Sequence, residues 1–466
     1  MSSIYQPVGR DSHSTVQVGD YLYMWGGDQP GLPAVHNDEE KQSICSVVEV
    51  CHLPTGTWVQ KPTTGGPPLG VQAYAAAVIR NEIFFYGGFC GHDKCYHNSL
   101  YSFNVDTFNW KELSPTTSHH GPKMKAGCGM VALCINDEDY LAVIGGLGPI
   151  DNNTPPQPGA QYREEAYQRC NEVHFYRLKT DEWTSPTVTG DRPPPINSFT
   201  LTSITNTTAI LFGGDIDQDN ESNDVYTFEF ANMSVKCTKL SNPGGSVQWP
   251  KKRSSHSSVL INCSSGPYLL VMGGIGGYPT KDCWLLNINK MEWKKLTKIP
   301  DSVTEMIGHS LSVWNETQTT HWIIEFGGKG NDTTFIEIIS STGDLVVQSV
   351  LDINEYQKRR IKDTESDKDI LDKKPQKGDL LRLFKSSSAH YSTIGTALDV
   401  QVDDLLHSPM LASDKLILVF QRWIDSNRGV TWRTVLQVCE DFPDQLGQAK
   451  AEVEGFLSSD RARYNY

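Results

Sequence analysis

Short apolar runs, each followed by two glycines, recur along the first three-quarters of the chain. The six copies are Tyr23-Met24-Trp25-Gly26-Gly27, Phe84-Phe85-Tyr86-Gly87-Gly88, Ala142-Val143-Ile144-Gly145-Gly146, Ile210-Leu211-Phe212-Gly213-Gly214, Leu270-Val271-Met272-Gly273-Gly274 and Ile324-Glu325-Phe326-Gly327-Gly328. Each triplet predicts a buried strand, and each glycine pair supplies a point without side chains where the backbone bends and neighbouring strands crowd. The first 345 residues therefore predict a repeat of one structural unit.

Further strand signals flank each triplet. Alternating segments follow at residues 100–103, 173–176, 225–228 and 284–286, and a tryptophan comes next at Trp58, Trp110, Trp183 and Trp293. Another short strand precedes the triplet, introduced by small polar residues and histidine, so each unit has four strands. We expect the tryptophans to fill the gaps between adjacent sheets. Six such sheets bury one another only in a closed ring, which predicts a six-bladed β-propeller.

The pattern resembles the kelch repeat family, whose signature is a strand ending in paired glycines and a later aromatic pair across a turn. The resemblance covers residues 1–350, about three-quarters of the chain. Units four and six depart from the signature because they lack the tryptophan. The units also exceed the family's usual length of about 50 residues, and we assign the excess to long loops at 147–170 and 215–223.

A second domain is predicted beyond residue 350. Residues 351–378 are rich in Lys, Arg, Asp and Glu, which predicts a solvated, partly helical linker. Leu416, Val419, Phe420 and Trp423 then follow a helical period, with Asp414 placed to cap the helix. The other helices are expected at 380–385, 390–398, 402–406, 431–439 and 446–457. Residues 379–460 should form a small all-α bundle.

This C-terminal pattern resembles the death-domain superfamily. The segments that carry the resemblance are Ile394-Gly395-Thr396-Ala397-Leu398, Val419-Phe420-Gln421-Arg422-Trp423 and Thr431-Trp432-Arg433-Thr434-Val435-Leu436. The family places the first segment in its second helix and the other two in its fourth and fifth helices. The resemblance implies a death-fold-like domain, with an unrelated helical bundle as the alternative.

Net charge and cysteine content indicate which kinds of partner and which cellular compartment to expect. The net charge of -14 disfavours binding to nucleic acids and to anionic membranes. Residues 1–25 show no basic stretch followed by an apolar one, and eleven scattered cysteines are unlike a disulfide framework. We therefore expect a soluble cytoplasmic protein with free thiols and with protein or peptide partners.

Four possible zinc ligands fall within eight residues: Cys90, His92, Cys95 and His97. Thiolates and imidazoles suit zinc, but structural zinc motifs usually carry two ligand pairs separated by a longer stretch. The cluster is expected in one propeller loop whose fold needs no metal. The sequence by itself therefore favours no metal site.

A second cluster imitates the start of a calcium-binding loop. Asp215, Asp217 and Asp219 alternate as calcium ligands do, and Asn220 follows. However, Asn220 replaces the glycine that the loop needs, and Tyr226 stands where the bidentate glutamate belongs. These residues predict a solvated acidic loop.

Sequence motifs for catalysis or cofactor binding are absent. The chain has no Gly-x-Ser-x-Gly, no His-Glu-x-x-His and no phosphate-binding loop that ends in Gly-Lys-Ser or Gly-Lys-Thr. His13, His256 and His309 stand beside serines at the same repeat position, which favours a structural hydrogen-bonding role. We therefore predict no catalytic residues, no metal and no cofactor.

Three functions remain open. The two resemblances together imply a non-enzymatic signalling adaptor, whose propeller binds a protein or peptide and whose death-fold domain joins itself or similar domains. The alternative is a substrate receptor of a cullin-type ubiquitin ligase. Such receptors clamp a tail carboxylate with arginines after a glycine pair, where this chain has Asp215. The third is a propeller enzyme that acts on a small molecule, by fold analogy alone.

Overall fold

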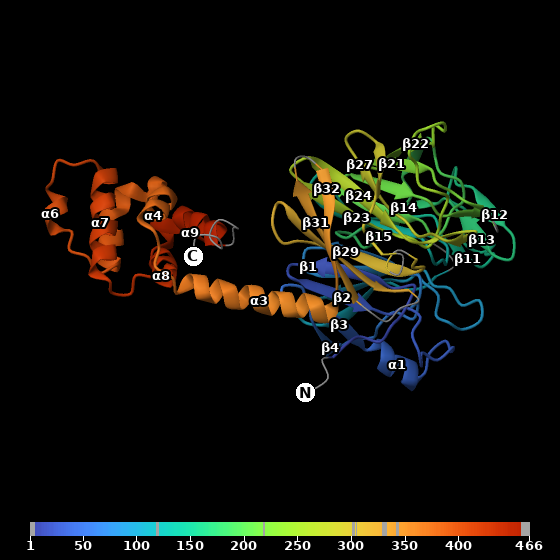
Figure 1. Cartoon of the computed structure of the whole chain (residues 1–466). Helices are drawn as coiled ribbons and strands as arrows, with labels where there is room; N and C mark the ends of the chain where they lie inside the picture. The colour runs from blue at the N-terminus through green and yellow to red at the C-terminus, as the bar shows by residue number, and fades with distance from the viewer. Residues whose placement is uncertain are drawn as a thin grey trace. The chain divides into compact units, whose positions relative to one another are not determined.

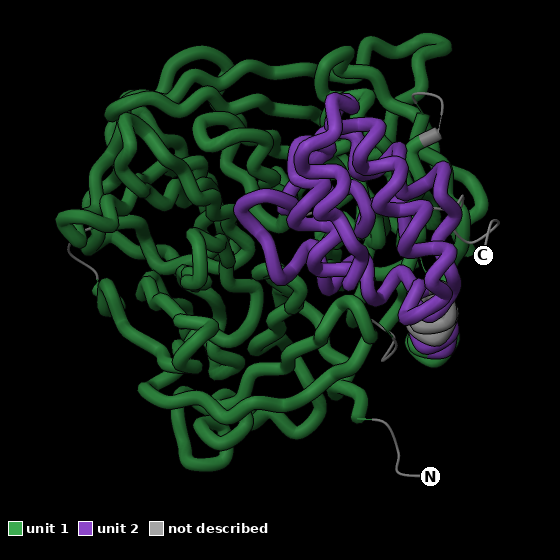
Figure 2. The backbone as a smooth tube through the Cα atoms, turned by 90° about the vertical axis from the view of Figure 1, so that its left-hand side faces the viewer, with its two compact units in different colours: residues 1–357 green, residues 358–466 purple. Residues whose placement is uncertain are grey.

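The protein is described by a computed structural model, which covers residues 5–117, 121–217, 220–300, 303, 305–328, 333–341 and 344–457. It divides into two compact units at residues 1–357 and 358–466, which Figure 2 shows in green and purple. We call them the propeller unit and the helical unit and describe each by itself. Among the described helices, none combines the length and the apolar character that a membrane crossing requires.

The propeller unit contains six main sheets among its described residues (Figure 1). Sheet 1 contains β1 (Ser14–Val18), β2 (Tyr21–Trp25), β3 (Val47–His52) and β4 (Thr57–Pro62). Sheet 2 contains β5 (Ala75–Ile79), β6 (Glu82–Tyr86), β7 (Leu100–Asn104) and β8 (Asn109–Ser114). Sheet 3 contains β9 (Gly129–Ile135), β10 (Glu138–Ile144), β14 (Val173–Arg177) and β15 (Glu182–Thr184). The second strand of each of these sheets carries the predicted triplet.

The other three sheets repeat this arrangement. Sheet 4 contains β17 (Thr200–Thr205), β18 (Thr208–Phe212), β21 (Val225–Ala231) and β22 (Ser234–Leu240), with β16 (Thr187–Gly190) added in parallel to β22. Sheet 5 contains β23 (Ser257–Cys263), β24 (Gly266–Met272), β27 (Cys283–Asn287) and β28 (Glu292–Leu296). Sheet 6 contains β29 (His309–Asn315), β30 (Thr320–Gly327), β31 (Thr333–Ser341) and β32 (Asp344–Asp352). The mainly-β, multi-sheet prediction is therefore confirmed.

A circle of backbone hydrogen bonds joins the residues that lead into the innermost strands. The six bonds run from Ser12 N to Gly308 O (2.9 Å), Ala73 N to Ser12 O (2.8 Å), Gly127 N to Ala73 O (2.8 Å), Ser198 N to Gly127 O (2.9 Å), Ser255 N to Ser198 O (2.9 Å) and Gly308 N to Ser255 O (3.0 Å). All six residues have left-handed backbone, with φ between 51° and 68°. The first main sheet thus meets the sixth directly, and both consist of strands consecutive in the sequence.

Tryptophans pack between adjacent sheets, as predicted. Each contacts the last residue of the triplet in the preceding sheet. The ring-centroid distances are 4.9 Å for Trp110 and Trp25, 5.4 Å for Trp183 and Tyr86, 5.0 Å for Trp293 and Phe212, and 5.7 Å for Trp58 and Phe326. The apolar core of this unit therefore lies mainly between the sheets.

We call the connection between the second and third strands of a sheet its glycine-pair loop. In sheet 1 this loop contains α1 (Glu39–Cys45). In sheets 3, 4 and 5 it forms small extra sheets: β11 (Leu147–Gly148) with β12 (Tyr162–Glu164) and β13 (Gln168–Cys170), β19 (Asp215–Asp217) with β20 (Asn220–Glu221), and β25 (Ile275–Gly276) with β26 (Tyr278–Pro279). The predicted loop at 147–170 therefore contains a three-stranded sheet, and the described part of the predicted loop at 215–223 forms a two-stranded sheet.

The propeller unit ends at residue 357, and the predicted boundary was residue 350. A helix, α3 (Ile353–Leu371), begins directly after β32 and occupies most of the predicted linker. Its first turn belongs to the propeller unit, because Tyr356 stacks on Phe335 at 3.8 Å and donates a hydrogen bond to Leu53 O at 2.8 Å. These buried contacts come from residues directly before the charged segment, so the propeller unit extends up to the start of that segment.

The helical unit is a small bundle. It includes α3 from residue 358 onward. The helices that follow among its described residues are α4 (Lys377–Leu383), a 3-10 helix (Lys385–His390), α5 (Tyr391–Ala397), α6 (Asp403–Leu406), α7 (Ala412–Ser426), α8 (Trp432–Asp441) and α9 (Pro443–Leu457). Val419, Trp423 and Trp432 are buried in one apolar core. One detail of the prediction was wrong: α7 begins at Ala412 after Leu411, so Asp414 lies in its first turn and is not the cap.

Candidate functional site

A cavity of about 250 Å³ lies along the inner strands of the ring. Residues from all six main sheets or the segments leading into them line it, including the three histidines singled out in the sequence. His13, His256 and His309 are all buried. Burial lowers the pKa of His13 and of His256 well below the usual range, and it lowers the pKa of His309 to about 4. The three imidazoles are therefore neutral at pH 7.

Two of these histidines form hydrogen bonds between neighbouring sheets. His13 Nε2 lies 2.9 Å from Ser310 Oγ in sheet 6, and His256 Nε2 lies 3.0 Å from Thr200 Oγ1 in sheet 4. The glycine pairs leave space for them: a Cβ added at Gly213 would lie 2.6 Å from the His256 ring. This geometry explains why glycine pairs and histidines recur together, and it agrees with the structural role predicted for these histidines.

Buried ion pairs are the main feature that the sequence analysis missed. In three sheets a buried cation lies three residues before the repeat position that His13 and His256 occupy. These cations are Arg10, Lys125 and Arg253. Arg253 pairs with Asp282 at 2.8 Å, and Lys125 pairs with Glu172. Arg10 lies 3.6 Å from Glu49. The signal was present as a repeated basic residue at this offset, and each acid stands at or just before the third strand of the same sheet.

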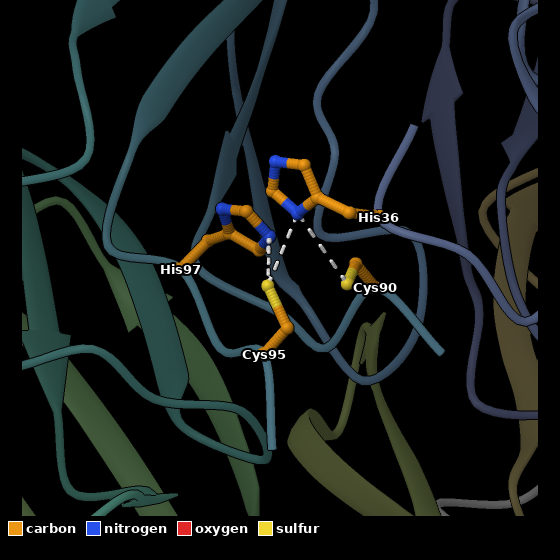
Figure 3. A group of neighbouring side chains, drawn as sticks. All are labelled: His36, Cys90, Cys95 and His97. Atoms are coloured by element: carbon orange, nitrogen blue, oxygen red, sulfur yellow. Dashed lines mark hydrogen bonds between the residues drawn. The ribbon is translucent and has the colours of Figure 1, made fainter. Parts of the chain in front are cut away.

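The predicted zinc candidates come together only in part. Cys90, Cys95 and His97 lie in the glycine-pair loop of sheet 2 and meet His36 from the glycine-pair loop of sheet 1 (Figure 3). The four possible ligand atoms all lie within 4.8 Å of one another, and His92 is not among them. We call this group the histidine–cysteine cluster. Its burial is graded, because His36 is exposed, Cys95 is half-buried, and Cys90 and His97 are buried.

Electrostatics at this cluster follow from burial. Burial, followed by the nearby His36 and Lys41, lowers the pKa of His97 to about 4. Burial, with a hydrogen bond to Cys90, raises the pKa of the Cys95 thiol to about 11. Without a metal, these shifts give a neutral His97 and a protonated Cys95 at pH 7.

The acidic cluster has other partners. Asp215 is in β19, where burial raises its pKa and Asn197 Nδ2 donates a hydrogen bond to its carboxylate at 3.3 Å. Asp217 accepts a hydrogen bond from Arg163 at 2.7 Å. Asp219 lies outside the described residues. The described part of this segment is thus a hairpin whose carboxylates bind other side chains of the chain.

The ring of repeat-derived sheets defines a kelch-type propeller-like fold, and comparison with known proteins gives the family. Residues 2–154 and 159–347 match the model of the KLHDC2/KLHL20/DRC7 Kelch-repeats domain. The chain belongs to this kelch-repeat family. The match ends before the helical unit, so the resemblance of that unit to death domains stays a prediction.

Individual relatives agree with the family. Human Kelch domain-containing protein 1 is 25% identical over 345 residues, which covers 69% of this chain and 76% of that protein. Host cell factor of Drosophila melanogaster is 25% identical over 275 residues, which covers 58% of this chain and 16% of that protein. The solved structure of YjhT aligns with a TM-score of 0.50 at 16% identity, covering 74% of this chain and 99% of that chain. This structural likeness supports the propeller-like fold.

Proposed function

We propose that this chain is a non-enzymatic binding adaptor. Its propeller unit, a six-bladed kelch propeller, binds a protein or peptide on the face formed by the glycine-pair loops. Its helical unit assembles with a second copy or with similar helical domains. The kelch family supports the first part, because kelch repeats generally mediate interactions between proteins.

The observation that carries the proposal is a row of partly exposed aromatic side chains on two neighbouring glycine-pair loops. Phe89 and Tyr96 of sheet 2 lie 5.1 Å apart, and Tyr96 lies 5.8 Å from Tyr167 of sheet 3. Lys94 Nζ lies 5.5 Å from the centre of the Tyr167 ring. Tyrosine and phenylalanine are enriched at protein interfaces because they supply large contact areas and lose little conformational freedom. We call Phe89, Tyr96 and Tyr167 the aromatic row.

Two histidines that line the cavity inside the ring are poorly placed to act as a catalytic base. Among the described residues that line it, His13 and His256 already form hydrogen bonds between sheets. A general base must be free to take a proton from a substrate. These two imidazoles are buried, and each has a ring nitrogen engaged in joining sheets, which favours a structural role.

The helical unit carries exposed ion pairs around its apolar core. Arg422 forms two hydrogen bonds with Asp404, at 2.8 and 2.6 Å, and Arg433 lies 2.9 Å from Asp372. Exposed pairs of this kind contribute little to folding stability, about 0–1 kcal/mol. Their charges are therefore available for complementary contacts with another domain.

Partner capture tests the propeller half of the proposal. The full chain and the double variant Tyr96→Ala/Tyr167→Ala are used as baits, and quantitative mass spectrometry identifies the bound proteins. We expect the double variant to lose the specific partners of the wild-type chain. The matched control is Met233→Asn, which changes an exposed apolar side chain in the β21–β22 turn and should keep them. If the double variant retains every partner, this binding face is wrong, and specific recovery of a cullin favours the ligase receptor instead.

Sedimentation of the full chain tests the helical half. We expect concentration-dependent self-association that Arg422→Glu weakens. Arg80→Glu serves as the control, because Arg80 is an exposed arginine of the propeller unit that also pairs with an aspartate. A chain that stays monomeric and captures no helical-domain protein contradicts this half.

A further inference from the structure

We propose that the histidine–cysteine cluster binds one zinc ion, which joins the glycine-pair loops of sheets 1 and 2. The proposal goes beyond the adaptor function and does not depend on it. The ligand atoms are His36 Nδ1, Cys90 Sγ, Cys95 Sγ and His97 Nε2. Two thiolates and two imidazoles are an established ligand set for structural zinc.

Distances between these atoms match tetrahedral coordination. Zinc bonds of about 2.3 Å to sulfur and about 2.0 Å to nitrogen place the ligand atoms of a tetrahedron roughly 3.3 to 3.8 Å apart. His36 Nδ1 lies 3.2 Å from Cys95 Sγ and 4.0 Å from Cys90 Sγ, and Cys95 Sγ lies 3.6 Å from His97 Nε2 (Figure 3). All four atoms lie within 4.8 Å of one another, so shifts of up to about an ångström bring them to zinc-binding positions.

The surroundings hold the ligands in place. His97 presents Nε2 to the cluster, and its Nδ1 lies 3.3 Å from Thr116 Oγ1. Histidine ligands of zinc commonly have such a partner on the second ring nitrogen, which fixes the tautomer and the ring orientation. The hydroxyl of Thr116 therefore occupies the place of an outer-shell residue.

Lys41 connects the two ligand-bearing segments. Its side chain is buried, and its ammonium donates hydrogen bonds to Val35 O at 2.9 Å, to His36 O at 3.3 Å and to Cys90 O. The backbone on both sides of the site is thus fixed by one cation. A zinc ion with two thiolates has no net charge, so the nearby ammonium of Lys41 does not oppose zinc binding. On binding, the two thiols release their protons to water, and no electron transfer is involved.

The site gives His36 a role. Residues 26–46 form the long glycine-pair loop of sheet 1, and this loop brings the exposed His36 onto the loop of sheet 2. His36 and His97 stack at 5.6 Å between ring centroids. Zinc at this point would hold the segment that contains Tyr96 of the aromatic row.

Metal analysis of the full chain tests the proposal. The protein is purified from cells supplied with zinc, dialysed and measured by inductively coupled plasma mass spectrometry. We expect about one zinc ion per chain. His36→Ala should reduce the content below about a tenth of an ion, because it removes a ligand. His36 is exposed, so this substitution leaves the core of the sheets intact. His92→Ala is the matched control, since it removes a histidine of the same loop that lies outside the cluster, and it should retain the zinc.

Two further measurements separate zinc binding from misfolding. Cobalt added to the metal-free wild-type chain should give the visible absorption of a tetrahedral site with thiolate ligands, and Cys95→Ser should weaken this absorption. Thr116→Val should lower zinc affinity about 10- to 100-fold in competition with a chromophoric chelator. The proposal is overturned if the wild-type chain takes up neither metal, if His36→Ala keeps full zinc affinity, or if non-reducing mass spectrometry finds a Cys90–Cys95 disulfide.

Discussion

The buried pair formed by Lys125 and Glu172 offers a direct test of how the propeller unit is stabilised. The two side chains are 2% and 1% exposed. Lys125 Nζ also lies 3.2 Å from Cys170 Sγ, and Glu172 accepts a hydrogen bond from Tyr162 OH at 2.8 Å. Lys125→Met keeps most of the side-chain volume but removes the ammonium. It leaves a buried carboxylate without its cation, which costs about 3–5 kcal/mol of unfolding free energy.

The double variant Lys125→Met/Glu172→Leu removes both charges. Replacing a whole buried pair by apolar side chains is often nearly neutral, so we expect it to recover at least about half of the loss. Urea unfolding of the full chain, followed by tryptophan fluorescence, gives the free energies for the cycle. The pairing argument is refuted if Lys125→Met costs less than about 1 kcal/mol, or if the double variant is less stable than the single one.

The same pair predicts a pH dependence. Burial alone raises the pKa of Glu172, but the charge of Lys125 and the hydrogen bonds from His174 and Lys125 outweigh burial and hold the pKa below the usual range. The stabilisation is therefore present above the unfolded pKa of about 4.3 and is lost as pH falls toward the folded value. In Lys125→Met the uncompensated burial raises that pKa. The variant should thus take up a proton on folding. Its loss of unfolding free energy relative to the wild-type chain should therefore become smaller as pH falls from 8 to 5. In the wild-type chain this pair should add no pH dependence of stability in that range.

Three other predictions concern packing. Trp110→Ala should lower the free energy of unfolding by about 3–5 kcal/mol in urea, because the side chain is 3% exposed and lies between two sheets. Gly213→Ala should lower the free energy of unfolding by more than about 2 kcal/mol, because its φ is +66° and a Cβ would lie 2.6 Å from a backbone oxygen. The control Gly244→Ala, with no atom within 4 Å of an added Cβ, should lower it by about 1 kcal/mol. Tyr356→Phe should cost about 1 kcal/mol, measured as a lower urea midpoint, by removing the hydrogen bond to Leu53 O.

The repeat made most of the propeller unit predictable. A triplet that is followed by two glycines marks the second strand of each main sheet. Once that strand is located, the positions of the other three strands of its sheet follow from the repeat. The helical period around Val419 and Trp423 likewise gave α7, although its start was misplaced. These signals are local, because strand and helix periods depend on residues only a few positions apart. The adaptor function and the death-fold identity of the helical unit stay predictions.

The histidine–cysteine cluster shows what local patterns miss. His92 stands beside Cys90, Cys95 and His97 in the sequence, and closeness in the chain alone made it a candidate ligand. The structure turns His92 toward solvent and supplies His36 from a loop of the neighbouring sheet. Spacing rules for metal ligands describe sites made within one segment. A site made across two sheets follows only once the order of the sheets around the ring is known.

The two repeats that lack tryptophan follow from the same packing between sheets. Four triplets end in an aromatic residue, and the next repeat around the ring supplies the tryptophan that packs on it. The other two triplets end in Ile144 and Met272. At those interfaces the fourth strand of the next sheet contributes aliphatic or thiol side chains, such as Cys237 and Val347. Because close-packed interfaces share their volume between both sides, a smaller or aliphatic triplet end goes with a smaller side chain from the fourth strand of the next repeat in this chain. The two missing tryptophans therefore follow from how neighbouring sheets of the ring pack on one another.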